Sequence, residues 1–375
     1  MAEHAAVDLA QQFALFARYC ERDNAPLYGR LSAGIADDKA LLRLVEAAPP
    51  AQRRPLLLLA AVHDLLLAGA EHPLAAHYPT LTAGRGRPHQ PTAGDAFADF
   101  AGFCRLHEER LAEMLATRAT QTNEVGRCTG LVPALAEAAR RAAEPLSVLD
   151  LGSSAGLNLL FDRYDYAYHH PASRTEVRVG EEGSAVRLEA EVRHGDLRGL
   201  GLPRLAQRAG LDLDPVDLDD PERARWLLAC QWPDHPERFF RAARAIEVAQ
   251  ATPNRPRVRH GHMVDDLAEA AAAAPLDSRL CVLHTWVAAY LSPAEQGRLD
   301  AAVTDLARGR PVSWLYAEQP YEVPGLEVPP PPDGPPDGAA TAVVLVELDG
   351  DRRRAERLAD MHPHGRWLRW WSAAR

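Results

Sequence analysis

The sequence predicts an α/β protein in which an all-helical N-terminal part precedes a mostly parallel sheet with helices on both faces. Two observations favour this fold class. From residue 147 onward, short apolar runs typical of buried strands alternate with longer stretches of helical period, as in sheets whose strands are joined by crossover helices. Between residues 1 and 143 the apolar residues recur at helical spacing alone. We therefore expect two domains, residues 1–143 and residues 144–375.

Four stretches of the N-terminal domain have a helical period. They are "VDLAQQFALFARYC", "LLRLVEAA", "QRRPLLLLAAVHDLLLAG" and "DAFADFAGFCRLHEERLAEML". Pro49, Pro50, Pro73 and Pro79 separate them, together with "TAGRGRPHQPTAGD", because proline and glycine interrupt helices. We expect helices and no strand in this domain.

The C-terminal domain begins with a predicted buried strand, "SVLDLG", which leads into a helix start, "LNLLFDRY". The alternating segments "TEVRVG" and "VRLEAEVRHG" are expected to pair as a hairpin. A second parallel strand is expected to end in "AGLDLDPVDL", and a helical block interrupted at Pro233 follows it. Further strands are expected in "RVRHGHMVDDL", "LCVLHTWVAAYLS" and "PVSWLYAEQP", each next to a helical stretch.

The end of the chain is expected to add two antiparallel edge strands, "AVVLVELDG" and "HGRWLRWW", joined by "DRRRAERLADMHP". Before them lies a Pro-rich loop, residues 324–338, with the sequence "PGLEVPPPPDGPPDG". This composition favours a polyproline II tether on the surface, and a substrate-covering loop is the alternative.

The composition excludes several kinds of partner. The formal net charge is −10, and the dense basic cluster Arg352–Arg354 is too small to bind nucleic acid. Apolar runs such as Leu56–Val62 fall well short of the roughly 20 residues that span a bilayer. With no leader-like segment, we expect a cytoplasmic protein without membrane contact. The five cysteines are far apart and form no C-x-x-C pair, which argues against disulfides and against thiolate zinc.

The loop after the first predicted strand fits the pattern of a hydrolase. Gly152, Ser154 and Gly156 spell G-x-S-x-G, the nucleophile elbow of serine hydrolases. Such an elbow follows earlier strands of the sheet, and no strand is predicted upstream. Asp305 and His362 can be named as the acid and the histidine of a catalytic triad, but a chain with 15 histidines always allows such a choice. A dinucleotide-binding G-x-G-x-x-G loop is also excluded, because it would need glycine at position 154.

The same loop resembles the first motif of class I S-adenosylmethionine-dependent methyltransferases, in which an acid and three small residues alternate after a strand. Here the motif reads Asp150, Gly152, Ser154 and Gly156, with serine in place of the family's central glycine. Small residues are needed because the chain turns sharply while its backbone passes close to the cofactor. We expect a negative φ at Ser154, where a side chain is tolerated. The following helix offers free N–H groups and a positive dipole end.

This resemblance extends along the chain. Residues 145–375 resemble the Rossmann-like class I methyltransferase fold in the order of their strands and in a closing antiparallel pair. The chain as a whole resembles the bacterial domain-of-unknown-function family DUF2332, in "NAPLYGRL", "QTNEVGRC", "LDLGSSAGLNLLFDRYDY", "ACQWPDHPER", "LHTWVAAYL" and "HPHGRWLRW". The resemblance implies a methyltransferase-like fold with S-adenosyl-L-methionine as cofactor. It does not indicate which reaction the protein catalyses.

The methyltransferase resemblance implies a set of cofactor-binding residues. The loop would contribute Asp150, Gly152, Ser153, Ser154, Gly156 and Asn158. An acid after the second strand would take both ribose hydroxyls, for which Asp212 is the candidate and Asp214 the alternative. Adenine would be recognised by Asp265 or Asp266, whose other interpretation is helix capping. Independently of the resemblance, Arg127 in "QTNEVGRC" is a candidate to pair with the cofactor's carboxylate if this segment folds over the loop, and a helix-surface cluster is its other interpretation.

The transferable methyl group would face the end of the fourth strand, at "VLHTW". There His284 is the candidate catalytic base for an acceptor that must lose a proton, and packing at a strand end is its other interpretation. Further residues are candidates for binding the acceptor: Trp232, Asp234, Trp286, His362 and His364. His260 and His262 form H-x-H, but local spacing provides no third ligand, so no metal is expected.

The sequence therefore predicts a methyltransferase whose acceptor, a small molecule, lies between a helical cap domain and the sheet domain. A non-catalytic ligand-binding protein on the same fold is the first alternative, and a serine hydrolase that uses Ser154 is the second. Oligomeric state stays open.

Overall fold

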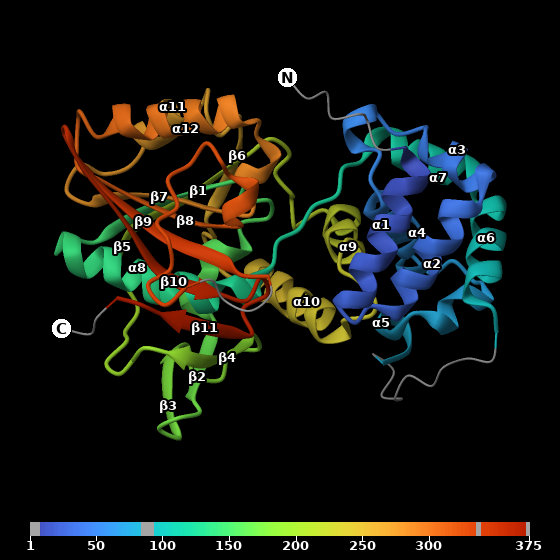
Figure 1. Cartoon of the computed structure of the whole chain (residues 1–375), viewed down its shortest axis with the longest axis horizontal. Coiled ribbons are helices and arrows are strands. Elements are labelled where there is room, and N and C mark those ends of the chain that lie inside the picture. The colour runs from blue at the N-terminus through green and yellow to red at the C-terminus, as the bar shows by residue number, and fades with distance from the viewer. Residues whose placement is uncertain (1–7, 84–93, 335–338, 373–375) are drawn as a thin grey trace. The chain divides into compact units, whose positions relative to one another are not determined.

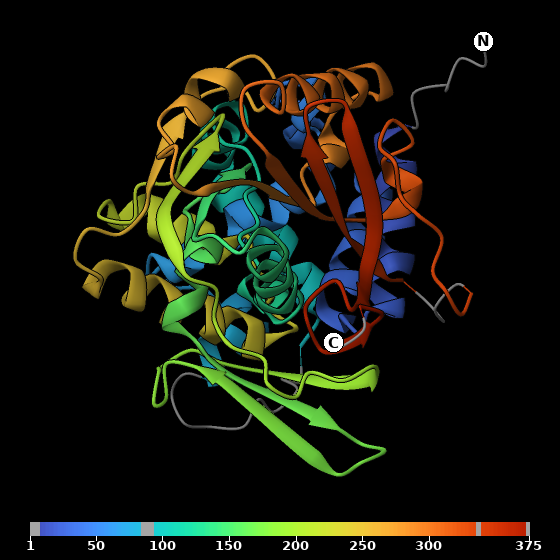
Figure 2. The ribbon, with the colours of Figure 1, turned by 90° about the vertical axis from the view of Figure 1, so that its left-hand side faces the viewer.

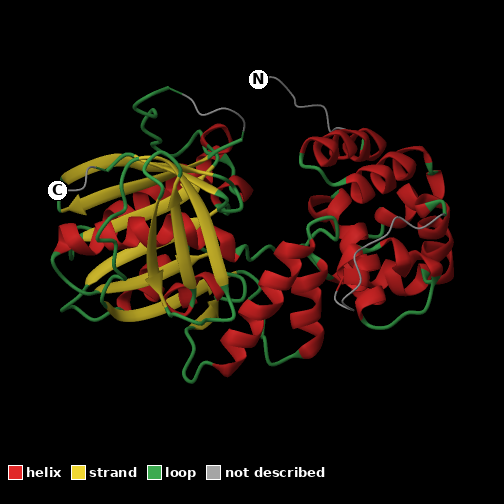
Figure 3. Cartoon of the chain, turned by 90° about the horizontal axis from the view of Figure 1, so that it is seen from below, coloured by secondary structure: helices red, strands yellow, loops and turns green. Residues whose placement is uncertain are grey.

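The structure is a computed structural model that describes residues 8–83, 94–334 and 339–372. It divides into two compact units, Met1–Thr122 with Leu218–Ala243, and Asn123–Asp217 with Arg244–Arg375. These units differ from the ranges expected from the sequence, because residues 123–143 belong to the second unit and residues 218–243 to the first. Among the described residues the strands are confined to the second unit, as Figure 3 shows.

The described part of the first unit is built of helices (Figure 1). They are α1 (Leu9–Arg22), α2 (Pro26–Asp37), α3 (Lys39–Val45), α4 (Pro55–Leu67), α5 (Pro79–Thr82), α6 (Ala96–Leu106), α7 (Glu108–Thr117), α9 (Pro221–Ala229) and the start of α10 (Pro236–Ala251), with the 3-10 helices η1 (Pro50–Gln52) and η2 (Pro73–His77). Helix α4 is buried along most of its length, which its run of leucines and alanines requires. Trp226 and Trp232 pack into the same apolar core, so the later segment joins this unit.

The second unit holds one eleven-stranded sheet with the order β3-β2-β4-β11-β10-β9-β8-β7-β1-β5-β6. The strands are β1 (Leu146–Leu151), β2 (Asp165–His170), β3 (Thr175–Gly180), β4 (Arg187–His194), β5 (Leu205–Asp212), β6 (Arg257–His260), β7 (Arg279–Thr285), β8 (Val312–Glu318), β9 (Thr341–Asp349), β10 (Arg352–Met361) and β11 (Trp367–Trp370). The stretch β6-β5-β1-β7-β8 is wholly parallel. Numbered along the chain, these five strands have the order 3-2-1-4-5, as in doubly wound sheets.

Helices cover both faces of this sheet (Figures 1 and 2). Helix α8 (Cys128–Ala142) packs on one face, against β4 and β7 to β10, and α11 (Leu267–Ala272) and α12 (Pro293–Leu306) pack on the other. Leu149 and Leu151 belong to the core beneath α11 and α12. Because side chains alternate along a strand, Asp150 between them points to the face that α8 covers.

Two expectations about strand pairing are wrong. The segments β3 and β4 do not pair, because β2 lies between them, antiparallel to β3 and parallel to β4. These strands, green in Figure 2, form one end of the sheet. The expected linker between the last two strands is itself the strand β10, which pairs antiparallel with β9 and β11. Strand β11 then pairs parallel with β4, so the closing strands lie inside the sheet and not at its edge.

The Pro-rich loop is fixed to the second unit over its described part. Gly325 N donates to Gln296 Oε1 at 2.8 Å, and Arg357 Nη1 donates to Pro329 O at 3.1 Å. Arg353 forms an ion pair with Glu327 at 3.1 Å. Residues 324–334 are therefore held by specific contacts and do not form a free tether, while residues 335–338 lie outside the described part. None of the helices among the described residues is long and apolar enough to cross a membrane.

Candidate functional site

The candidate site lies where the strand order of the parallel sheet reverses, between β1 and β7. Such switch points leave a crevice at the carboxyl ends of the strands, where ligands of open α/β sheets bind. In this chain the edge is formed by the loop 152–156 after β1, the turn 286–288 after β7, and the acids Asp212 and Glu318 at the ends of β5 and β8.

The loop after β1 turns through three left-handed residues, Gly152 (φ 68°), Ser154 (φ 53°) and Gly156 (φ 72°). The expected negative φ at Ser154 is therefore wrong, and a serine holds a conformation that glycine adopts more easily. Asp212 fixes the turn, because its Oδ2 accepts from Ser154 N at 2.8 Å. Its Oδ1 accepts from Asp214 N at 2.8 Å, so Asp214, the alternative candidate, lies in the same turn.

The chain's own packing requires a glycine at position 152. A Cβ added to Gly152 would lie 2.3 Å from Cγ2 of Val287, closer than real atoms approach. At Gly156 the same construction places Val258 Cγ2 at 3.0 Å. The sequence pattern predicts that these glycines allow the close approach of a cofactor. In the structure, positive φ angles and contacts with valine side chains are sufficient reasons, so the glycines do not by themselves indicate a ligand.

Asp150 is buried beside this loop, with 3% of its surface exposed. The pKa of Asp150 is raised from 3.8 to about 8, chiefly by burial and also by nearby Asp212, while Arg127 opposes the rise. The carboxyl group is therefore mostly protonated at neutral pH. A cation bound next to it would favour the ionised form.

Arg127 ends the 3-10 helix η4 (Val125–Arg127) and is 6% exposed. Its Nη1 donates to the carbonyl and hydroxyl oxygens of Thr285 at 3.3 and 3.4 Å. Its guanidinium carbon lies 5.2 Å from the centre of the Trp286 ring. In the same segment, Asn123 Oδ1 accepts from Leu157 N at 3.0 Å, at the start of the 3-10 helix η5 (Leu157–Arg163). The segment 123–127 therefore touches both the loop after β1 and the end of β7.

Trp286 has a left-handed backbone (φ 54°), which is rare for a bulky residue. Its indole Nε1 donates to Thr341 Oγ1 at 2.9 Å. The next two residues are held by Glu318, whose Oε1 accepts from Val287 N at 3.1 Å and from Ala288 N at 3.2 Å. Backbone strain of this kind collects at functional sites and persists where the surroundings over-determine it.

His284, the candidate base at the end of β7, is enclosed within the sheet unit. The side chain is fully buried, and its ring stacks on Tyr316 with 5.2 Å between ring centres. Its Nδ1 lies 2.8 Å from Glu318 Oε1. His284 pairs in register with Leu151, so it lies on the face that α11 and α12 cover, opposite Asp150. Its place in the core fits the packing interpretation better than that of a base.

The turn between β10 and β11 approaches the segment 123–127. Arg127 Nε donates to Pro363 O at 3.5 Å, and Thr129 Oγ1 donates to Gly365 O at 3.0 Å. His364 Nδ1 lies 3.3 Å from Glu124 Oε2, and His362 Nδ1 accepts from His364 N at 3.0 Å. The structure thus brings His362 and His364 into the neighbourhood of Arg127.

Trp232 and Asp234 belong to the first unit and have packing roles there. The Trp232 ring lies 5.2 Å from that of Phe16, and the Asp234 carboxylate accepts from Leu27 N at 2.7 Å and from Tyr28 N at 3.1 Å at the start of α2. Asp234 satisfies two N–H groups at the start of α2, and Trp232 packs in an aromatic cluster. Both side chains therefore have structural roles in the helical unit that do not require a bound methyl acceptor.

The acids before α11 are engaged with neighbouring residues. Asp265 is exposed, forms an ion pair with Arg298, and lies 3.2 Å from His262 Nδ1. Asp266 accepts from His262 N at 2.6 Å, and it makes no side-chain capping bond to α11. Within the described ranges no three His, Cys, Asp or Glu side chains are grouped as a metal site, so the pair His260 and His262 gains no third ligand.

Two small polar residues of the predicted set are buried in the loop region. Ser153 is 1% exposed, and no described residue forms a hydrogen bond with its Oγ. Asn158 is 3% exposed and accepts a long contact from Cys128 Sγ at 3.5 Å. A hollow of about 490 Å³ adjoins the loop at Ala155, with Val216 and Asn254 in its wall.

Three residues that shape the site are absent from the predicted set: Thr285, Glu318 and Thr341. Glu318 carried a usable signal, because it is an acid at the end of a predicted strand, as Asp212 is. Thr285 and Thr341 act through contacts with Arg127 and Trp286, which lie far away in the sequence, and no local pattern reveals them.

The chain belongs to the family described as uncharacterized protein conserved in bacteria (DUF2332), whose model matches residues 10–370. No curated protein matches the chain. The match covers residues of both units, and the description of the family names no reaction.

Proposed function

We propose that this member of the DUF2332 family binds S-adenosylmethionine in its second unit and transfers the methyl group to a small-molecule acceptor. The position of Asp212 carries the proposal. This acid ends β5, and its carboxylate lies 2.8 Å from Ser154 N in the loop that leaves β1. In doubly wound nucleotide-binding sheets, an acid at the end of the strand next to the first one binds the ribose hydroxyls.

The other residues of the edge suit the charged end of the same molecule. Asp150 provides a carboxyl group that an ammonium group would ionise, since a nearby cation lowers the pKa of an acid. Arg127 provides a guanidinium, and charge-assisted bonds between a guanidinium and a carboxylate are strong. The buried Ser153 Oγ, which has no hydrogen-bond partner among the described residues, is a further polar group in the loop. When bound, S-adenosylmethionine supplies a methyl group activated on a sulfonium sulfur.

The contribution of the chain to methyl transfer is alignment. Alignment of nucleophile, carbon and leaving group is worth roughly 7 to 11 kcal/mol in well-oriented reactions. Glu318 holds the backbone of residues 287 and 288, and this turn presents the half-buried Trp286 at the end of β7. We assign no base, because His284 is enclosed on the other face of the sheet.

A non-catalytic binding protein on the same fold is the second candidate, and the burial of His284 favours it. A hydrolase is not proposed. The left-handed Ser154 resembles the sharp turn of a nucleophile elbow. However, Asp305 is 62% exposed and pairs with Arg308 at 3.1 Å, whereas the acid of a catalytic triad is buried against its histidine.

Thermal unfolding with increasing S-adenosylhomocysteine tests cofactor binding without a known acceptor. A ligand at 100 times its Kd adds roughly 2.7 kcal/mol of stability. Asp212→Asn is expected to weaken binding roughly tenfold or more, because a hydrogen bond to a charged group contributes roughly 1.5 to 3 kcal/mol. Asp265→Asn is the matched control, since Asp265 is exposed and paired with Arg298.

The absence of any shift with the native chain would sink the proposal. A shift that Asp212→Asn leaves intact would remove the residue on which it rests. Mass spectrometry of small-molecule extracts incubated with the cofactor then separates the two candidates: a methylated product supports the transferase, and binding without product supports the non-catalytic protein.

A further inference from the structure

Gln319 carries a buried hydrogen-bond acceptor that the fold leaves unused. The residue follows β8 directly and is 3% exposed. None of the described residues donates a hydrogen bond to its side-chain oxygen Oε1. A buried oxygen without a donor is unfavourable, and native proteins keep few such groups. The position of this oxygen in the fold shows which partner it suits.

Gln296, another buried glutamine of the second unit, has the usual arrangement. Its Nε2 donates to the carbonyl oxygen of Ala288 at 3.0 Å, and its Oε1 accepts from Gly325 N at 2.8 Å. Both ends of this amide are bonded within the chain. The fold therefore accounts for Gln296, whereas it leaves the amide oxygen of Gln319 without a structural role.

Strand pairing places Gln319 on the side of the sheet that α8 covers. Its backbone is extended (φ −76°, ψ 119°), so its side chain continues the alternation of β8. Glu318 before it contacts His284 on the opposite face, beneath α11 and α12, and this turns Gln319 towards α8. Because Glu318 pairs antiparallel with Ala342, the position opposite Gln319 is Thr341.

Thr341 joins this position to the candidate site. Its Oγ1 accepts from the indole Nε1 of Trp286 at 2.9 Å, and the Trp286 ring lies 5.2 Å from the guanidinium carbon of Arg127. Side chains that stand opposite each other on antiparallel strands lie on one face, with roughly 5 Å between their Cβ atoms. Gln319 is therefore a neighbour of the Thr341 and Trp286 pair, at the same edge as Arg127.

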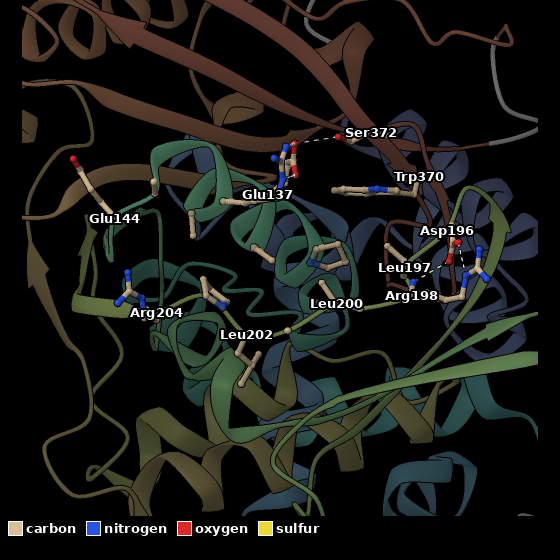
Figure 4. A pocket seen from close by; sticks show the side chains of 18 residues that line it. Glu137, Glu144, Asp196, Leu197, Arg198, Leu200, Leu202, Arg204, Trp370 and Ser372 are labelled. Carbon is tan, nitrogen blue, oxygen red and sulfur yellow. Dashed lines mark hydrogen bonds and ion pairs between the residues drawn. The ribbon is translucent and has the colours of Figure 1, made fainter. Parts of the chain in front are cut away.

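A hollow elsewhere in the second unit has no such feature. It has a volume of about 450 Å³ and is lined by one side of α8, by residues 196–204 and by residues near the end of the chain (Figure 4). Its acids are paired, because Glu137 accepts from Ser372 Oγ at 3.2 Å and Asp196 accepts from Arg198 N at 2.8 Å. None of the residues in its wall, all of which belong to the described part, has a buried polar atom without a partner. The unused acceptor thus lies at the candidate site and not in this hollow.

The groups around Gln319 restrict the molecule that it binds. Its oxygen requires an N–H or O–H donor and repels an anion. The guanidinium of Arg127 beside the Trp286 ring repels a cation. The half-buried indole offers a flat apolar surface. A neutral planar molecule with a hydrogen-bond donor meets all of these conditions.

We propose that Gln319 binds the methyl acceptor through its side-chain oxygen, and that this acceptor is a neutral azole, a ring with one N–H and one unprotonated nitrogen. The inference rests on the proposed function, since it names the class of molecule that receives the methyl group. It adds Gln319 as the residue that selects this class.

The two nitrogens of an azole have different roles in the transfer. The N–H donates to Gln319 Oε1. The lone pair of the other nitrogen forms the bond to the methyl carbon while the carbon–sulfur bond breaks and its electron pair stays on sulfur. The ring becomes a cation, so its N–H donates more strongly to Oε1 in the transition state, and this proton passes to water after release. The step needs no protein base, in agreement with the enclosed position of His284.

The first test compares the thermal midpoints of the native chain and Gln319→Met without ligand. Methionine has a similar length and flexibility and lacks the amide. Because the variant no longer buries an unpaired acceptor, we expect its midpoint to rise by roughly 2 to 4 °C. Gln296→Met is the matched control, and its midpoint should fall because that amide is bonded at both ends. A midpoint of Gln319→Met at or below that of the native chain would show a structural role for the amide and overturn the proposal.

The second test measures the binding of benzimidazole by isothermal titration with S-adenosylhomocysteine present at saturation. The comparison compound is 1-methylbenzimidazole, which lacks only the N–H. We expect it to bind roughly five- to tenfold more weakly than benzimidazole, the usual effect of one lost hydrogen bond. In Gln319→Met the two compounds should bind equally weakly, while the affinity for S-adenosylhomocysteine stays unchanged.

The outcomes separate this inference from the proposed function. If the native chain does not bind S-adenosylhomocysteine, both fail. If it does, but benzimidazole does not bind, or the preference for benzimidazole persists in Gln319→Met, the inference fails and the proposed function stands. With S-adenosylmethionine, the native chain should convert benzimidazole to 1-methylbenzimidazole, which mass spectrometry detects, and equal conversion by Gln319→Met would also overturn the role of Gln319.

Discussion

Asp150→Asn tests whether β1 carries a protonated carboxyl group beneath the loop. Burial and the neighbouring Asp212 raise the pKa of Asp150, Arg127 opposes the rise, and the pKa is raised from 3.8 to about 8. Between these pKa values the folded chain holds a proton that the unfolded chain has lost. The free energy of unfolding therefore falls by about 1.4 kcal/mol for each unit of rising pH. From pH 5 to pH 8 the loss is on the order of 3 kcal/mol.

Asparagine keeps the shape of the side chain and cannot ionise, so the variant lacks this dependence on pH. Urea unfolding of both proteins at several values between pH 5 and pH 8 measures the difference in stability. We expect Asp150→Asn to gain stability over the native chain as pH rises, with the largest gain at pH 8. Asp305→Asn is the control, because Asp305 is 62% exposed. Parallel stability curves for Asp150→Asn and the native chain would refute a raised pKa at Asp150.

The remaining predictions concern the backbone around the site. Gly152→Ala should lower stability by about 2 to 4 kcal/mol, since it combines a left-handed φ with a clash against Val287. Adding Val287→Ala should restore part of that loss in a double-mutant cycle by urea unfolding, and purely additive effects would contradict the contact. Ser154→Gly should change stability by less than about 1 kcal/mol, because relief of the left-handed strain offsets the extra freedom of glycine. Glu318→Gln should cost about 2 kcal/mol and increase hydrogen exchange at the amides of residues 287 and 288, whose protection in the native chain depends on the carboxylate. Unchanged exchange there would show that another group fixes Trp286.

Within the parallel part of the sheet, β1, β7 and β8 were predictable because they are buried on both faces. Runs such as those of β1, β7 and β8 are apolar almost throughout and stand out between helical stretches. Strand β2 was missed because "DYAYHH" contains histidines and an acid, although most of it is buried. Strand β10 was missed because its first half is exposed and rich in arginine, a composition typical of linkers. In both cases neighbouring strands override the local composition.

The candidate site was predictable to the extent that a local pattern marks it. Asp150 and Asp212 stand near the ends of β1 and β5, and Asp212 contacts the loop through Ser154 N. The contact of Arg127 with Pro363 joins residues 236 positions apart, and no spacing rule anticipates it. The face on which His284 lies depends on strand alternation, and a shift of one residue would turn it towards Asp150.

Strand β11 has a consequence for how the chain is synthesised. It pairs with β4, whose other neighbour is β2, so β4 has one open side until residues 367–370 leave the ribosome. At roughly 5 to 20 residues per second, that side waits many seconds for its partner. A nascent or truncated chain that ends before Trp367 therefore exposes a strand edge able to pair with other chains, so β11 protects the sheet against aggregation.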